Sequence, residues 1–242
     1  MAEDKNLGAA ELSLVVPTYN EKELITHSIT GMFDNLKMHG LDAEIVVVDD
    51  SKDGTEQILQ QLAKEYKRLN VIHRENKRGV GSAIRLGIES ASGKYVVVFM
   101  SDAPDDIKYV PSVMTKLRDG YDLVHTSRFM KGSEVVGYPF IKTVSNRLFN
   151  AVVRVAFLRL DLKDFTSLFK GFSKEAAMRL NLEANEFDVG LEIALKSIRK
   201  GYKITEVPVS WYERTAGRSK LRLSKQAPQF IKRILKVWFL YW

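Results

Sequence analysis

Apolar, β-branched runs alternate with amphipathic stretches along the first half of the chain. The runs are continuous rather than alternating, which is typical of strands buried on both faces of a sheet. Strands are expected at Leu12–Val16, Glu44–Val48, Asn70–His73, Tyr95–Phe99 and Asp122–Thr126. The segments between them have apolar residues at helical spacing, and helices are expected over 21–38, 55–68, 80–91 and 106–118. This order predicts an α/β fold with a mainly parallel sheet and helices on both sides.

The pattern changes after residue 130. A long helix is expected over 141–160, with Val144, Leu148, Val152 and Val155 on one side, and a further strand over Tyr202–Val209. Gln226–Trp242 is predicted to be helical and is dense in aromatic residues. No linker or repeat divides the chain, so we expect one domain over 1–224 and a C-terminal extension over 225–242.

Charge is distributed unevenly. The formal net charge is +7, but no acid follows Glu213, and the tail beyond it carries eight lysines and arginines. Such a tail favours an anionic partner: nucleic acid, pyrophosphate or lipid headgroups. The absence of cysteine excludes disulfides and thiolate metal sites. A polar N-terminus and the lack of an 18-residue apolar run predict neither a cleaved signal peptide nor a complete transmembrane helix.

Acidic residues crowd the ends of three predicted strands. The strands run into Pro17–Glu21, Asp49–Thr55 and Ser101–Asp106. Ligands gather at the carboxyl ends of strands in α/β sheets, and like charges there need a cation or sugar hydroxyls. Asp102, Asp105 and Asp106 are the best metal candidates, because hard oxygen ligands suit Mg²⁺ or Mn²⁺.

Several of these residues have a second interpretation. Asp53 is as well explained by a helix-capping turn, and Asp105 and Asp106 by the capping of helix 106–118. The Asp49–Asp50 pair has no obvious structural role and suits a base N–H or ribose hydroxyls. The segment Arg74–Ala83, with Gly79 and Gly81, has the form of a phosphate or sugar loop that opens a helix. It lacks the spacing of a dinucleotide fingerprint, which excludes a nicotinamide dehydrogenase.

Seven segments, in order, resemble glycosyltransferase family 2, and within it the polyprenyl-phosphate glycosyltransferases. They are VVPTYNE (15–21), VVVDDSKDGT (46–55), NKRGVGSA (76–83), FMSDAPDD (99–106), TSRF (126–129), DFTSLFKGFSK (164–174) and EVPVSWYERTAGRSKL (206–221). The resemblance covers about residues 11–224. It implies a GT-A type, Rossmann-like catalytic domain that moves a sugar with inversion from GDP-mannose or a UDP-sugar to a polyprenyl or dolichyl phosphate, using Mg²⁺ or Mn²⁺.

The resemblance also implies roles for matching positions. The nucleotide sugar is assigned to Pro17, Tyr19, Glu21, Asp49, Asp50, Lys77, Gly79 and Asp102. The acceptor phosphate is assigned to Ser127, Arg128 and Lys170. The catalytic set is Asp102, Arg128, Arg214 and Lys220, of which the last two would clamp phosphates from a loop. Two departures stand out: the usual Asp-x-Asp is displaced to Asp102, Asp105 and Asp106, and Leu168 replaces a glycine, which predicts a tighter pocket.

The expected acceptor decides the catalytic chemistry. A phosphate monoester is largely ionised at neutral pH and needs little help from a base. A hydroxyl of a polysaccharide or protein, the alternative acceptor, would need a carboxylate base, for which Asp188 and Glu192 are the candidates. Their other interpretation is the exposed first turn of a helix.

The basic, aromatic end of the chain predicts contact with a membrane. Phe230–Trp242 combines five aromatic residues with Lys232, Arg233 and Lys236, as at the interface of an anionic leaflet. A helix docked on the core is the alternative. We expect a peripheral protein at the cytoplasmic face, or one anchored by a segment beyond residue 242; a homo-oligomer or an anchoring partner is left open. A protein that uses the tail to bind nucleic acid is the rival from another class, although no nucleic-acid motif is present and none is expected as a partner.

Overall fold

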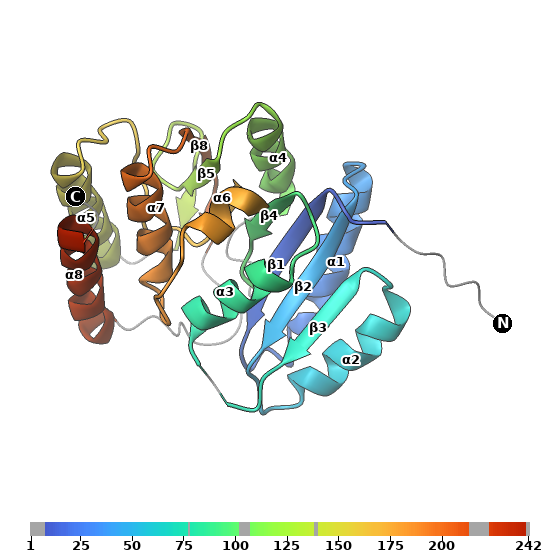
Figure 1. The fold of residues 1–242 in the computed structure, drawn as a ribbon. Coiled ribbons are helices and arrows are strands. Elements are labelled where there is room, and N and C mark those ends of the chain that lie inside the picture. The colour runs from blue at the N-terminus through green and yellow to red at the C-terminus, as the bar shows by residue number, and fades with distance from the viewer. Residues whose placement is uncertain (1–7, 77, 102–106, 138–139, 213–222, 241–242) are drawn as a thin grey trace.

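A seven-stranded sheet forms the centre of the molecule (Figure 1). The structure is a computed structural model that describes residues 8–76, 78–101, 107–137, 140–212 and 223–240. In chain order the strands of this sheet are β1 Leu12–Thr18, β2 Ala43–Asp49, β3 Leu69–His73, β4 Tyr95–Val98, β5 Leu123–Ser127, β7 Lys170–Ser173 and β8 Ile204–Pro208. Their spatial order is β3-β2-β1-β4-β7-β5-β8, and β7 alone runs antiparallel to its neighbours β4 and β5. The predicted mainly parallel sheet is therefore confirmed.

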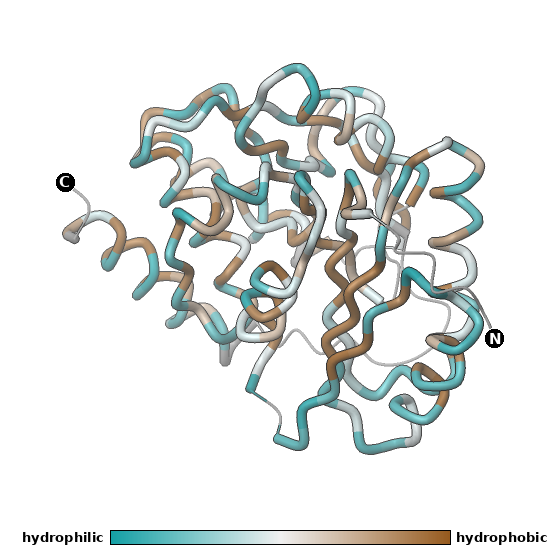
Figure 2. Tube along the Cα trace, turned by 45° about the vertical axis from the view of Figure 1, so that its right-hand side comes forward, coloured by the Kyte–Doolittle hydropathy of each residue, from teal (hydrophilic) through white to brown (hydrophobic). Residues whose placement is uncertain are grey.

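Helices cover both faces of this sheet, as predicted. On one face lie α1 Ile25–Met38, α2 Thr55–Glu65 and α4 Val110–Arg118; on the other lie α3 Val80–Ser90, α6 Lys174–Arg179 and α7 Val189–Arg199. Successive residues of β1 serve the two layers, because Leu14 and Val16 pack with α1 whereas Val15 packs with α3. Figure 2 shows the resulting apolar strands at the centre of the fold.

A third layer forms beyond α7. The helices α5 Phe140–Ala156 and α8 Leu223–Leu240 pack against it through a separate cluster that includes Val153, Leu195 and Val237. Edge-to-face ring pairs join the layer, with centroids 5.7 Å apart for Phe149–Phe230 and 5.3 Å for Phe157–Trp238. One side of α8 is thus packed against the rest of the protein, as the alternative interpretation of the tail expected. No helix in the described part of the chain is both long and apolar enough to cross a membrane.

The short strand β7 is the main element that the sequence did not predict. Lys170, Gly171 and Phe172 are fully buried, although lysine and glycine are uncommon in strands. A Cβ at Gly171 would collide with the Val113 side chain, so the glycine lets α4 lie directly on the sheet. Two smaller differences are the 3₁₀ turn η1 Ile107–Tyr109 before α4, and a two-stranded parallel ribbon of β6 Val135–Val136 with β9 Trp211–Tyr212.

Candidate active site

The loops that follow β1 and β2 are joined by hydrogen bonds at the carboxyl edge of the sheet. The Asn20 amide donates to Ser51 Oγ at 2.7 Å, and the Glu21 amide donates to Thr55 Oγ1 at 3.1 Å. Asn20 itself has a positive φ of 52°, a conformation that asparagine tolerates better than most residues. This contact places the Pro17–Glu21 segment beside Asp50, as the sequence predicted for a shared nucleotide site.

Asp49 is held by protein groups. It is fully buried, and its Oδ2 lies 2.8 Å from Nδ1 of His73, while Ser51 donates to Oδ1 through both its amide and its hydroxyl. His73 also lies near Glu56, at 3.5 Å. Asp49 therefore has a structural role, that of joining β2 to β3 through His73, and the sequence predicted neither this role nor this partner.

Asp50 forms a two-pronged ion pair with Arg74. The guanidinium donates to both carboxylate oxygens, at 2.6 and 2.7 Å, and the Arg78 amide adds a third bond at 3.2 Å. Arg74 continues to Ser82 Oγ, 2.7 Å away in the first turn of α3. The geometry fixes Asp50 firmly at the edge of the sheet and links it to α3.

The N-terminus of α3 is closed by a carbonyl of the protein. The Gly81 and Ser82 amides both donate to Asn185 O, at 2.8 and 3.4 Å. Gly79 has φ +85°, and a Cβ there would collide with the same carbonyl oxygen. The two amides are therefore not open to a phosphate, contrary to the expected phosphate loop. Contact of Gly79 with the nucleotide sugar stays a prediction.

At the end of β5, Arg128 is paired with a buried carboxylate. Its Nε lies 2.7 Å from Asp164 Oδ2 and its Nη2 lies 3.1 Å from Oδ1, with a further bond to Thr166 Oγ1. Burial alone would raise the pKa of Asp164, but the Arg128 guanidinium holds that pKa below its usual range. Arg128 keeps 13% of its side-chain surface exposed and is oriented by Asp164.

Lys170 and Ser127 lie deeper than a surface ligand reaches. Lys170 is fully buried, with Nζ 2.8 Å from Nδ1 of His125, and burial lowers the pKa of Lys170 to about 7. Ser127 is also buried, and its Oγ accepts from the Phe129 amide at 3.3 Å. In this geometry the ammonium of Lys170 points into the core, and its contact with the acceptor phosphate stays a prediction.

Asp188 and Glu192 begin α7, as one interpretation expected, but they are buried instead of exposed. Arg233 of α8 binds both, with Nε 2.9 Å from Asp188 Oδ2 and Nη1 2.9 Å from Glu192 Oε1. Lys196 lies 2.9 Å from the same Glu192 oxygen. Both carboxylates thus serve ion pairs inside the protein.

Six predicted site residues lie outside the described residues. They are Lys77, Asp102, Asp105, Asp106, Arg214 and Lys220. Within the described ranges, no group of three histidines or carboxylates is placed to hold a metal ion.

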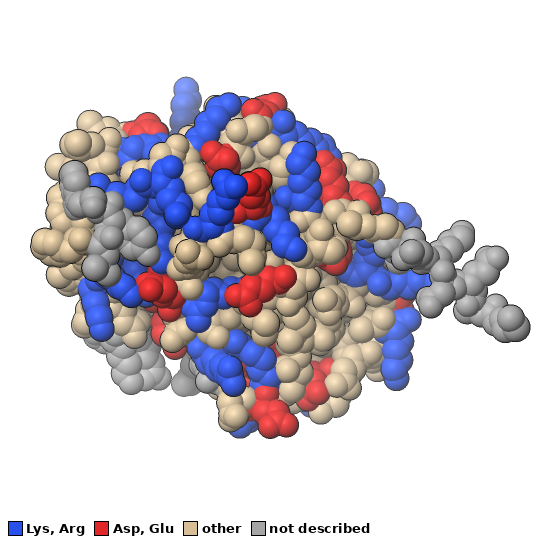
Figure 3. All heavy atoms as spheres, in the orientation of Figure 1, with Lys and Arg blue, Asp and Glu red and all other residues tan. Residues whose placement is uncertain are grey.

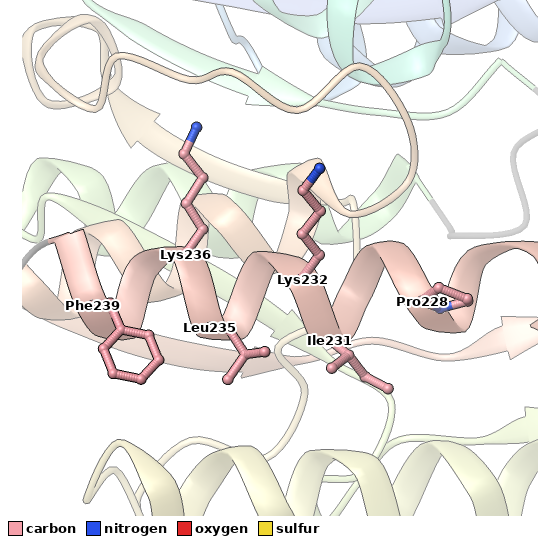
Figure 4. A pocket seen from close by; sticks show the side chains of 6 residues that line it. All are labelled: Pro228, Ile231, Lys232, Leu235, Lys236 and Phe239. Atoms are coloured by element: carbon pink, nitrogen blue, oxygen red, sulfur yellow. The ribbon is translucent and has the colours of Figure 1, made fainter.

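The outer faces of α5 and α8 expose apolar side chains. On α5 these are Phe140, Val144, Leu148, Val152 and Val155, and on α8 they are Ile231, Leu235 and Phe239. The two helices lie together at one edge of the molecule (Figure 1), where Figure 3 shows a group of uncharged residues. A groove on α8 is lined by the three apolar residues together with Pro228, Lys232 and Lys236, and the two lysines point to the other side of the helix (Figure 4). Lys236 lies 2.7 Å from Glu183 and Arg233 lies 3.6 Å from the same carboxylate, so both cations of α8 have an acidic partner within the protein.

Comparison with known proteins gives consistent matches. The sequence profile of glycosyl transferase family 2 matches residues 13–180. A dolichol-phosphate mannosyltransferase of Pyrococcus furiosus is 32% identical over 94% of this chain and 63% of its own length. Glycosyltransferase AglD of Haloferax volcanii is 32% identical over 95% of this chain and 37% of its own. The chain thus spans less than two thirds of either relative.

Among solved structures, glucosyl-3-phosphoglycerate synthase from Mycobacterium tuberculosis, in complex with Mn²⁺, uridine diphosphate and phosphoglyceric acid, has the same fold. Its TM-score is 0.70 at 21% identity, and the match covers 94% of this chain and 78% of that one. The same enzyme was also solved with Mg²⁺ and uridine diphosphate, with a TM-score of 0.68 at 22% identity.

Proposed function

Because the chain belongs to glycosyl transferase family 2 and is a nucleotide-sugar-dependent glycosyltransferase, we propose that it transfers the sugar, with inversion, to a polyprenyl phosphate at a membrane surface. The observation that carries the proposal is the similarity, over nearly the whole chain, to a protein named as a dolichol-phosphate mannosyltransferase. The donor is GDP-mannose or a UDP-sugar.

The donor site is proposed at the ends of β1 and β2. Pro17, Tyr19, Glu21 and Asp50 lie on adjoining loops there, in a position to contact the base and ribose. Thr18 supports this placement, because its buried hydroxyl has no hydrogen-bond partner among the described residues. A buried hydroxyl without a partner costs free energy that a bound ligand would recover.

A divalent cation is proposed beside the donor. Asp102, Asp105 and Asp106 follow β4 in the sequence, and β4 pairs in parallel with β1, so the carboxyl ends of these two strands lie at the same edge of the sheet. Their carboxylates are the oxygen ligands that Mg²⁺ and Mn²⁺ prefer, and the related fold has been solved with both ions and uridine diphosphate. Such an ion, if held by these carboxylates, would neutralise charge on the departing diphosphate.

The acceptor phosphate is proposed to approach Arg128. An ionised phosphate monoester is already a nucleophile, so the protein mainly has to position it and balance charge. Asp164 fixes the guanidinium in one orientation, which leaves Arg128 ready to bind without further ordering. Arg214 and Lys220 are proposed to add positive charge around the diphosphate.

The membrane is proposed to meet the apolar faces of α5 and α8. Leu148 and Leu235 are 65% and 50% exposed, and the apolar residues of each helix recur at a spacing that keeps them on one side. A contiguous apolar face of this kind on a protein surface marks an interaction site. It suits a protein whose acceptor is a membrane lipid.

A hydroxyl acceptor is less well supported. A hydroxyl acceptor needs a general base, and the two candidates for it, Asp188 and Glu192, both form ion pairs with Arg233. Asp164, the carboxylate nearest to Arg128, is itself engaged in the ion pair with that guanidinium.

The proposal is tested with a panel of radiolabelled nucleotide sugars and a short polyprenyl phosphate, with Mn²⁺ and with EDTA. We expect organic-extractable label from one donor, only with the metal. Transfer to a soluble saccharide, with no lipid product from any donor, would contradict the proposed acceptor.

A further inference from the structure

The segment 181–188 contacts both α8 and the first turn of α3, and Glu192 holds its residues 183 and 184. Glu192 Oε2 accepts from the Ala184 amide at 2.7 Å and the Glu183 amide at 3.0 Å. Its Oε1 accepts from Arg233 and Lys196, each at 2.9 Å. The carboxylate is fully buried, so every acceptor site on it is used to hold backbone and cations in place.

Asn185, the next residue of the segment, contacts α3. Asn185 O caps the Gly81 and Ser82 amides, and its Oδ1 accepts from Arg85 Nη2 at 2.8 Å. Arg85 also donates to Ala184 O, so α3 donates hydrogen bonds to the carbonyls of two consecutive residues, Ala184 and Asn185. The close approach depends on Gly79 and Gly81, where a Cβ would collide with the carbonyls of this segment.

From α3 the contacts continue into the donor site. Ser82 Oγ accepts from Arg74, and Arg74 forms the two-pronged pair with Asp50. The series from Arg233 to Asp50 is made of hydrogen bonds, and its members other than the exposed Asn185 are buried or half-buried. A shift of the 183–186 segment would therefore move the first turn of α3 and the guanidinium that orients Asp50.

We propose that Glu192 is a positioning residue for nucleotide binding. It acts through Ala184 and Asn185 on α3 and couples the seating of α8 to the donor site; the inference rests on the proposed location of that site at Asp50. In Glu192→Gln, an amide NH₂ has to face either the two backbone amides or the two cations, all of which are donors. One set of bonds is lost, so the segment loses either its amide bonds to α7 or the link through Glu192 to Arg233 of α8.

The test is the dissociation constant of a nucleoside diphosphate, measured by calorimetry on the full chain with Mn²⁺. GDP and UDP are tried first, and the tighter ligand is used for all variants. We expect Glu192→Gln to weaken binding about tenfold, within the usual range for coupled sites. Arg233→Lys, which keeps the charge but loses the fork, should weaken it in the same direction by less. The matched control is Glu175→Gln, because Glu175 is an exposed carboxylate paired with Arg179 on α6.

Three outcomes overturn the proposal. The first is wild-type affinity in a folded Glu192→Gln or, should that variant not fold, in Arg233→Lys. The second is unchanged affinity with a lost kcat, which would make Glu192 a catalytic base. The third is weaker nucleotide binding by Glu192→Gln together with wild-type binding by Asp50→Asn, because the effect would then not reach the nucleotide through Arg74 and Asp50. Failure of the lipid acceptor would appear only in the transfer assay, so it is distinguishable.

Discussion

Lys170 imposes a pH-dependent cost on the fold. Its ammonium is fully buried beside His125, and burial lowers its pKa from 10.5 to about 7, even though Asp164 and Glu206 partly offset the effect. The Arg128 guanidinium, also nearby, acts in the same direction as burial. Replacement by methionine keeps a long side chain in the site and removes the titration.

The sign follows from proton binding. Between pH 7 and pH 10.5 the unfolded chain keeps the Lys170 proton and the folded chain releases it, so the free energy of unfolding rises with pH. The cost is fully developed below pH 7 and disappears above 10.5. From pH 7 to pH 9 the wild type should gain about 2 kcal/mol relative to Lys170→Met, taking ~1.4 kcal/mol for each pH unit over which the proton difference is complete. His125 adds little in this window, because burial lowers its pKa and it stays neutral in the fold.

The assay is urea denaturation at pH 7, 8 and 9 of the wild type, Lys170→Met and Lys64→Met. Lys64 lies exposed on α2 and is the matched control. The difference in unfolding free energy between wild type and Lys170→Met should change steadily with pH, and that for Lys64→Met should stay constant. A constant difference for Lys170→Met would show that Lys170 is solvated, and would restore it as a candidate for the acceptor phosphate.

Three further predictions concern the pair behind Arg128, the apolar faces and the contact with α3. Asp164→Asn should lower the unfolding free energy by about 3 kcal/mol, because it leaves the largely buried Arg128 guanidinium without its carboxylate. The control is Asp161→Asn, which removes an exposed carboxylate paired with Arg159 and should change the unfolding free energy little. Equal losses in the two variants would refute the buried ion pair. The double variant Leu148→Ser, Leu235→Ser should bind anionic liposomes more weakly in co-sedimentation, with an unchanged Tm. The control Met38→Ser, at an exposed position on α1, should bind them as the wild type does. Wild-type binding by the double variant would contradict membrane contact through α5 and α8. Gly81→Ala should destabilise the fold by about 1–3 kcal/mol, since its Cβ would collide with Ala184 O. The control Gly31→Ala, which meets open space on α1, should be neutral or slightly stabilising. The same result for both variants would show that the contact between α3 and Ala184 is loose.

The sheet was predictable because its strands carry a strong local signal. Continuous β-branched runs such as Val46–Val48 favour a strand in a sheet covered on both faces, and these valines are fully buried there. Lys170 and Gly171 lack that signal, since β7 is a strand only because α4 and two neighbouring strands surround it. The segments that resemble the family identified the family itself from sequence alone.

The pairing of buried charges was much harder to predict. Asp49 and His73 are direct partners in the β2–β3 register, which becomes apparent only when the two strands are aligned. Glu192 gave an available signal: its helix, α7, carries apolar residues on most sides of the stretch from Val189 to Leu195, which indicates a buried helix and not an exposed first turn. Its partner Arg233 lies about forty residues further on, and no local pattern connects them.

The most direct test of the proposed reaction compares a polyprenyl phosphate with the free polyprenol of the same chain length. Both are offered with the active nucleotide sugar and Mn²⁺, and the product is analysed by NMR for its anomeric configuration. Transfer to the phosphate alone, with inversion at the anomeric carbon, is the predicted result. Equal transfer to both lipids, or retention of configuration, would contradict the account.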